Sequence, residues 1–172
     1  MAIELDGARK ILDRIADLAP SPGATAPFEA LLLEAFSAVA SPLRGLTNLE
    51  RFLAAKGSPV ATLTYLRDSP GPLRFLSRIL GHSEYPSEIL IRNPEFFDDL
   101  MEAPDPPRSV AEIRDIFSGP FRVFRETDRA TGLVRTEWRR QILRLAAADI
   151  HKRLPLRRVV RTLSDMADAV VD

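Results

Sequence analysis

Apolar residues recur at intervals of three and four along most of the chain, the spacing that places side chains on one face of an α-helix. The first stripe spans residues 8–18 and precedes a loop at Pro20–Gly23. The second spans residues 28–39 and ends at Ser41-Pro42. No stretch shows the sustained alternation of apolar and polar residues that is typical of a strand. The pattern therefore predicts an all-α fold.

The middle of the chain contains three helix-start signals in close succession. Ser58-Pro59, Ser69-Pro70 and Asn93-Pro94 each place an oxygen-bearing capping residue before a proline. A proline is tolerated at the first helical position because the N–H that it lacks would have no partner there. These signals predict short helices in the first part of the chain.

Two further sites have the spacing of a capping box, in which two side chains satisfy each other's free backbone N–H groups. They are Thr47 with Glu50 and Ser109 with Glu112. Ser118-Gly119-Pro120 has turn composition and is predicted to interrupt the helix that follows the second box.

The C-terminal part carries two longer stripes, after a segment at residues 103–107 that holds three prolines and is predicted to be a linker. We expect an irregular array of about eight to ten helices, with residues 1–103 and 104–172 packed as one domain. The first long stripe runs from Val134 to Asp149. The second is predicted to face the core with Leu156, Val159, Val160, Leu163, Met166, Ala167 and Val170.

The composition narrows the class of protein without identifying a reaction. The 172 residues include no cysteine and two histidines 69 positions apart, which excludes disulfides, thiolate nucleophiles and cysteine-bound zinc. No run approaches the roughly 18 apolar residues of a membrane helix, and the N-terminus lacks the apolar stretch of a signal peptide. A cytoplasmic protein is therefore expected.

Charge is balanced overall, at 24 basic and 24 acidic residues, but it is segregated along the chain. Residues 122–161 hold twelve basic and four acidic side chains, whereas residues 84–105 hold seven acidic side chains and one arginine. Arginines four apart form same-face rows on the predicted helices. These rows could form a solvated face that pairs with the acidic segment, bind a phosphate or nucleic acid, or contact a protein partner. The candidate partner-contact residues are Arg135, Arg139, Arg140 and Arg144.

Other charged residues do not assemble a predicted active site. Asp98, Asp99 and Glu102 put two carboxylates four apart on one helical face. This spacing suits a divalent metal ion or acid–base chemistry, but most often it is a solvated surface. Asp165 and Asp168 are three apart on a helix, unlike the aspartates two apart on a strand that nucleotidyl transfer uses. We therefore predict no catalytic, cofactor-binding or metal-binding residue in this chain.

Three segments, read in order, carry a resemblance to a known family. Over residues 46–171, their succession resembles the helical region that precedes the nucleotidyltransferase domain in the glutamate–ammonia ligase adenylyltransferase family, the bifunctional regulator of glutamine synthetase. Arg161 and residues 150–152 depart from the family pattern. The segments are Thr47-Asn48-Leu49-Glu50-Arg51-Phe52; Gly81-His82-Ser83 with Leu90–Glu95, Asp98 and Leu100; and Trp138–Ala146 with Asp149, Val159 and Leu163–Ala169.

The resemblance implies a parent enzyme that transfers AMP from ATP to a tyrosine of glutamine synthetase, or removes it by phosphorolysis, using magnesium or manganese. It places the catalytic domain downstream of this chain, so ATP and metal are implied there and not in this segment. The implied partners are that domain, glutamine synthetase and a nitrogen-regulatory signalling protein, with no membrane. The start at Met1 resembles the adenylyl-removing half, although a comparable helical stretch precedes the other half.

Our leading hypothesis is a non-catalytic helical module, inactive alone, that packs against the nucleotidyltransferase domain. The apolar pattern of the last helix reaches Val171, which favours a chain that continues into that domain. The exposed patch left there is expected to make the isolated chain self-associate. The alternative is a free-standing all-α adaptor, or a nucleic-acid-binding module whose arginine rows bind with a steep salt dependence.

Overall fold

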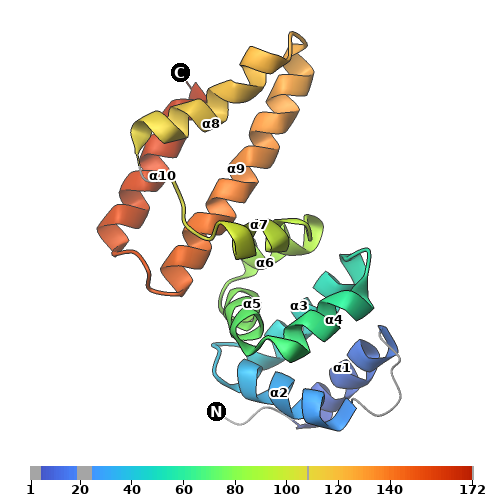
Figure 1. The fold of residues 1–172 in the computed structure, drawn as a ribbon. Helices are drawn as coiled ribbons and strands as arrows, with labels where there is room; N and C mark the ends of the chain where they lie inside the picture. Colours follow the sequence, from blue (N-terminus) through green and yellow to red (C-terminus); the bar gives the residue numbers. More distant parts are fainter. Residues whose placement is uncertain (1–4, 19–24, 108, 172) are drawn as a thin grey trace. The chain divides into compact units, whose positions relative to one another are not determined.

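The computed structural model describes residues 5–18, 25–107 and 109–171, so the loop expected at Pro20–Gly23 lies outside the described residues. All regular elements in the described ranges are helices, which confirms the all-α prediction (Figure 1). The two longest are α9, with 24 residues, and α10, with 16. The ten described helices are α1 (Leu5–Leu18), α2 (Thr25–Ser37), α3 (Pro42–Ala55), α4 (Pro59–Asp68), α5 (Pro70–His82), α6 (Glu84–Arg92), α7 (Phe96–Glu102), α8 (Val110–Val123), α9 (Thr127–Ile150) and α10 (Leu156–Val171).

The chain divides into two compact units, Met1–Met101 and Glu102–Asp172. Residues 103–107, which follow α7, contain no helix, as their three prolines predict. None of the described helices is both long enough and apolar enough to cross a bilayer.

Helix α3 is the centre of the first unit, because it packs against α1, α2, α4, α5 and α6. Its inner face follows the helical repeat, with Leu46, Leu49, Phe52 and Leu53 all at 0% exposure. Burying each such side chain contributes roughly 1.5–3 kcal/mol relative to leaving it in water. The amphipathic repeat of α3 therefore organises the helices around it.

Helices α3 and α5 approach closely at two glycines. A Cβ atom on Gly45 would lie 2.6 Å from the Phe36 ring, and a Cβ atom on Gly81 would lie 2.2 Å from Cγ2 of Val39. The backbone N–H of Ser41 donates to the Gly81 carbonyl at 3.0 Å. Steric room, and not an unusual φ angle, is what requires glycine at both positions.

Proline, and not a serine hydroxyl, marks the starts of α4 and α5. Both helices begin where predicted, at Pro59 and Pro70, but neither Ser58 nor Ser69 caps the helix with its side chain. The helix start predicted at Asn93-Pro94 is wrong. Helix α7 begins at Phe96, and the Asn93 side-chain amide instead donates to the Ile89 carbonyl at 2.8 Å, at the end of α6.

Of the two predicted capping boxes, one forms in part and one does not. Ser109 Oγ accepts the Glu112 N–H at 3.1 Å and caps α8. The Thr47 box is wrong because α3 already begins at Pro42, so Thr47 lies inside the helix and donates to the Leu43 carbonyl at 3.0 Å.

The turn predicted at Ser118-Gly119-Pro120 is also wrong, because all three residues lie within α8. Pro120 lies near the C-terminal end of α8, which stops at Val123. The N–H of Phe124 donates to the Pro120 carbonyl at 2.9 Å, so the helical bonding continues past the proline. A proline this close to a helix end removes one backbone hydrogen bond without breaking the element.

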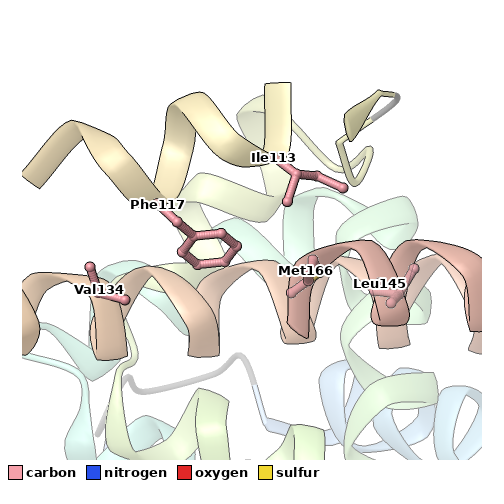
Figure 2. Packing of buried hydrophobic residues seen from close by; sticks show 5 residues of the cluster. All are labelled: Ile113, Phe117, Val134, Leu145 and Met166. Carbon is pink, nitrogen blue, oxygen red and sulfur yellow. The ribbon is translucent and has the colours of Figure 1, made fainter. Parts of the chain in front are cut away.

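In the second unit, α8 packs against both α9 and α10. Trp138 is partly buried against its core, with a distance of 6.0 Å between the ring centroids of Trp138 and Phe117. The core comes from all three helices (Figure 2), with Ile113 and Phe117 from α8, Val134 and Leu145 from α9, and Met166 from α10.

Helix α10 buries less of its apolar surface than predicted. Of the expected core stripe, Met166 is fully buried and Val159 is partly buried against the core of the unit. Leu156, Val160 and Leu163 are exposed. The apolar face of this helix is wider than the surface that packs against α8 and α9, so part of that face is exposed.

Candidate functional site

The family-like segment in α3 serves contacts inside the first unit. Asn48 is buried, and its side-chain amide donates to the Leu80 carbonyl of α5 at 3.1 Å. Glu50 accepts two hydrogen bonds from the Arg14 guanidinium of α1, at 2.6 and 2.8 Å. These two residues of the segment therefore link α3 to α5 and to α1.

Arg51, the next residue of the segment, lies 2.5 Å from a carboxylate oxygen of Glu88 on α6. The hydrogen bond from Arg51 is the main reason that the pKa of the Glu88 carboxyl is lowered from its ordinary value, with a further contribution from Arg92. Arg92 lies 3.5 Å from the other oxygen of the same carboxylate. Glu88 is therefore held ionised between two guanidinium groups.

The acidic face around Asp98 is occupied by a cation of the same unit. Lys56 Nζ lies 2.8 Å from the Asp98 carboxylate and 3.2 Å from the Pro94 carbonyl. The ammonium also lies 6.0 and 5.8 Å from the ring centroids of Phe52 and Phe97, within cation–π range. Among the described residues, no group of three or more His, Asp or Glu side chains is arranged to hold a metal ion.

The four candidate arginines of α9 divide into two pairs with different surroundings. Arg135 and Arg139 are exposed and lie one helical turn apart. Within the described part of the chain, neither makes an ion pair or a hydrogen bond through its side chain. They place two exposed guanidinium groups on one strip of the helix.

Arg140 and Arg144 are half-buried and are engaged by their own helix to different degrees. Arg140 lies 2.6 Å from the Glu137 carboxylate, which also accepts the side-chain amide of Gln141 at 2.5 Å. The Nε atom of Arg144 and the Oε1 atom of Gln141 are buried without a hydrogen-bond partner among the described residues. Gln141 is fully buried. The sequence did not identify it as a core position, because the apolar stripe is found from apolar residues and glutamine is polar.

A shallow hollow of about 230 Å³ lies between the start of α8 and α10. Its lining residues include Ser109, Arg158, Arg161, Thr162 and Asp165. Because Asp165 lines the hollow together with the two arginines, the charge of the lining is mixed and not of one sign.

Comparison with known proteins places these features in a family. The sequence profile of the glutamate-ammonia ligase adenylyltransferase family matches residues 73–172. The bifunctional glutamine synthetase adenylyltransferase/adenylyl-removing enzyme of Corynebacterium glutamicum is 32% identical over 145 residues, which cover 82% of this chain and 14% of that enzyme. The enzyme of the same name from Mycobacterium avium is 27% identical over 99% of this chain and 18% of its own length.

No solved structure matches this chain. The chain spans less than a fifth of the length of the curated relatives it matches, so it corresponds to a segment of those enzymes. The matching relatives favour this interpretation over a free-standing adaptor or nucleic-acid-binding module. With the profile covering more than half of its residues, the chain belongs to the glutamate-ammonia ligase adenylyltransferase family.

Proposed function

We propose that this chain is a non-catalytic helical module of an enzyme that attaches AMP to glutamine synthetase or removes it. The observation that supports this role is how the family-like residues are used. Asn48, Glu50 and Arg51 are each bonded to another helix of the first unit, and Asp98 is paired with Lys56. Residues engaged in this way stabilise a scaffold and do not present a reactive group to a substrate.

In this proposal, ATP and a magnesium or manganese ion bind to a separate nucleotidyltransferase domain of the same cytoplasmic enzyme. That domain transfers AMP to a tyrosine of glutamine synthetase or removes it by phosphorolysis. The helical module contributes a rigid support, and the chain alone has neither activity.

The surface that we assign to a partner is the strip formed by Arg135 and Arg139. Both guanidinium groups are exposed and free of ion pairs within the described residues. Two such arginines four residues apart on a helix, where Cβ atoms are typically about 5–6 Å apart, suit a carboxylate-rich surface. We propose that the carboxylate-rich surface that the strip contacts belongs to the nucleotidyltransferase domain. Glutamine synthetase and a nitrogen-regulatory signalling protein are further partners of the whole enzyme.

A chimeric enzyme tests the module and the strip together. The corresponding segment of the Corynebacterium glutamicum enzyme is replaced by this chain, and AMP incorporation into glutamine synthetase is measured. The chimera is expected to be active, and the isolated 172-residue chain is expected to be inactive. The Arg135→Glu/Arg139→Glu chimera is expected to lose at least tenfold in rate.

Arg125→Glu is the matched control, because Arg125 is an exposed arginine of the same unit outside the strip. It is expected to keep the activity of the unmodified chimera. A double variant that retains full activity would remove the strip from the proposal, whereas AMP transfer by the isolated chain would overturn the non-catalytic role.

A further inference from the structure

A hollow of about 300 Å³ lies between α2 and α5, two helices of the first unit that pack against each other. Its floor is apolar, because Ala35, Val39 and Leu73 line it and are each at most 9% exposed. Leu31 adds a half-buried side chain to the lining. The hollow is at the small end of the range of volumes in which proteins bind other molecules.

Helix α2 is apolar on more than one side. Leu31, Leu32 and Leu33 are consecutive, and successive residues of a helix point about 100° apart. Leu32 is buried, whereas Leu31 and Leu33 are half-buried. A helix that is apolar on most sides is usually covered on most sides. The first unit therefore covers only part of α2, and the hollow lies along the side that carries Leu31.

The edge of the hollow that α5 forms is basic. Arg74 and Arg78 both line the hollow, and they lie one helical turn apart with exposed side chains. Neither side chain makes an ion pair or a hydrogen bond with any residue that the structure describes. On the opposite edge, α2 contributes one exposed carboxylate, Glu34. The two guanidinium groups and the apolar floor thus line one and the same hollow.

We propose that this hollow binds an amphipathic helix with carboxylates along one flank, supplied by another part of the same enzyme. This inference rests on the proposed function, in which the chain is a module of a longer enzyme. Apolar side chains of the bound helix fill the floor, and its carboxylates pair with Arg74 and Arg78. Glu34 on the other edge favours an uncharged or basic residue on the second flank.

The length of the hollow determines the sequence pattern of its occupant. Along α5 the lining runs from Pro70 to Arg78, and along α2 it runs from Leu31 to Val39. Eight residues of helix correspond to about 12 Å, or roughly two turns. The occupant is therefore expected to present apolar residues at positions i, i+3 or i+4, and i+7. Two carboxylates four residues apart on one flank match the spacing of the two arginines.

The small size of the contact favours an occupant from the same enzyme. Two turns of helix bury less surface than the roughly 1,200 Å² at the low end of stable interfaces, so a free helix or a second copy would bind weakly. A tethered helix is present at an effective concentration of about millimolar, at which a weak site is filled. The matched segment is 14% and 18% of the two relatives named above, so most of such an enzyme lies outside it.

Peptide titrations test the proposal on the full 172-residue chain. The peptides tile the Corynebacterium glutamicum enzyme outside the matched segment and are about 20 residues long, since shorter helices are marginal in water. They are titrated into the isotope-labelled chain, and backbone amide NMR shifts are followed. At least one peptide with the expected pattern should shift the amides that line the hollow, with a Kd between about 10 μM and 1 mM.

Charge reversal tests the basic edge. Arg74→Glu/Arg78→Glu is expected to weaken binding of that peptide at least tenfold, and a peptide whose carboxylate residues are replaced by lysine is expected to bind this variant again. Arg157→Glu/Arg161→Glu is the matched control, because these two arginines are also exposed and four apart, on α10. It is expected to bind the original peptide as the natural chain does.

Filling the hollow tests its floor. Ala38→Trp places a large side chain at an exposed alanine that lines the hollow, and it is expected to abolish the shifts. Ala30→Trp is the control, at an exposed alanine of α2 outside the lining, and it is expected to keep them. Circular dichroism checks that every variant keeps its helices.

Three results would overturn the proposal. They are the absence of hollow-directed shifts with every peptide at about 1 mM, equal binding by both tryptophan variants, and hollow-directed binding only by peptides that tile glutamine synthetase. The last result would assign the hollow to a separate protein. Failure of the proposed function is recognised separately, because AMP transfer by the isolated chain is measured without any peptide.

Discussion

The Cα atom of Gly81 lies 3.1 Å from the position that a Cβ atom would take on Gly45, so the backbones of α3 and α5 are in contact where these helices cross. The contact brings Ser41 within hydrogen-bond distance of the Gly81 carbonyl and Asn48 within reach of the Leu80 carbonyl. Arg44 adds a long contact to the Gly81 carbonyl at 3.5 Å. Close backbone approach and hydrogen bonds therefore both fix the crossing of α3 and α5.

Gly81→Ala is expected to destabilise the chain by about 1–3 kcal/mol, the usual cost of overpacking a close-packed site. The new methyl group would meet Cγ2 of Val39 at 2.2 Å and Cβ of Val39 at 2.7 Å, so the backbone must move. Urea unfolding followed by circular dichroism measures the change. Val39→Ala in the same chain is expected to restore part of the loss.

Gly71→Ala is the control on the same helix, since nothing lies within 4 Å of its added Cβ atom. Alanine is favoured over glycine in a helix by up to about 1 kcal/mol, so this variant is expected to be neutral or more stable. Equal destabilisation by both alanines would contradict the steric explanation.

Asn48→Leu is expected to cost about 1–3 kcal/mol, because it removes the donor to the buried Leu80 carbonyl. Thr47→Val, one position away, is the control, since the Thr47 hydroxyl donates to the Leu43 carbonyl of its own helix and not to another helix among the described residues. Denaturant midpoints compare the two variants. A loss for Asn48→Leu no greater than that for Thr47→Val would show that the link between α3 and α5 contributes nothing.

Glu88→Gln is expected to change how stability depends on pH. Because the hydrogen bond from Arg51 lowers the pKa of Glu88 in the folded chain, its stabilisation is complete above the ordinary value of 4.5. It is lost as the pH falls through the lowered pKa. The variant should be less stable than the natural chain by about 1 kcal/mol at pH 7, and the difference should shrink below pH 4.5.

Glu95→Gln provides the comparison for this pH series, because Glu95 is exposed and has no ion pair within the described residues. At pH 7 its stability is expected to equal that of the natural chain. A Glu88→Gln difference that is the same at pH 7 and at pH 3 would contradict the role of the pair.

Phe117→Ala is expected to destabilise the second unit by about 3–5 kcal/mol, since Phe117 is buried between the helices of that unit. Trp138 is the single tryptophan, and its ring centroid lies 6.0 Å from that of Phe117. Its fluorescence therefore reports the unfolding of this unit. Phe121→Ala, at a 53% exposed phenylalanine of the same helix, is the control and should leave the transition nearly unchanged. A fluorescence midpoint that does not move in Phe117→Ala would place the core elsewhere.

Local sequence signals predicted several helix starts and failed where tertiary contacts compete. Pro59 and Pro70 begin helices as expected, because a proline ring fixes φ without any partner. Thr47 and Glu50 had the spacing of a cap, yet α3 begins five residues earlier at Pro42, and Glu50 instead bonds Arg14. A capping box and an exposed pair on a helix surface have the same residue types, so spacing alone does not separate them.

The sequence by itself determined that the chain is helical, where most stripes lie and which family it resembles, because periodicity and residue order are properties of the chain. Only the tertiary structure decided which charges are free. Arg140 is paired with Glu137, while Arg135 and Arg139 of the same helix make no ion pair with any residue that the structure describes. It also decided that Met166 is buried and Leu163 exposed on α10, although both belong to one apolar pattern. The reason is that periodicity gives the width of an apolar face, whereas the neighbouring helices determine how much of that width is covered.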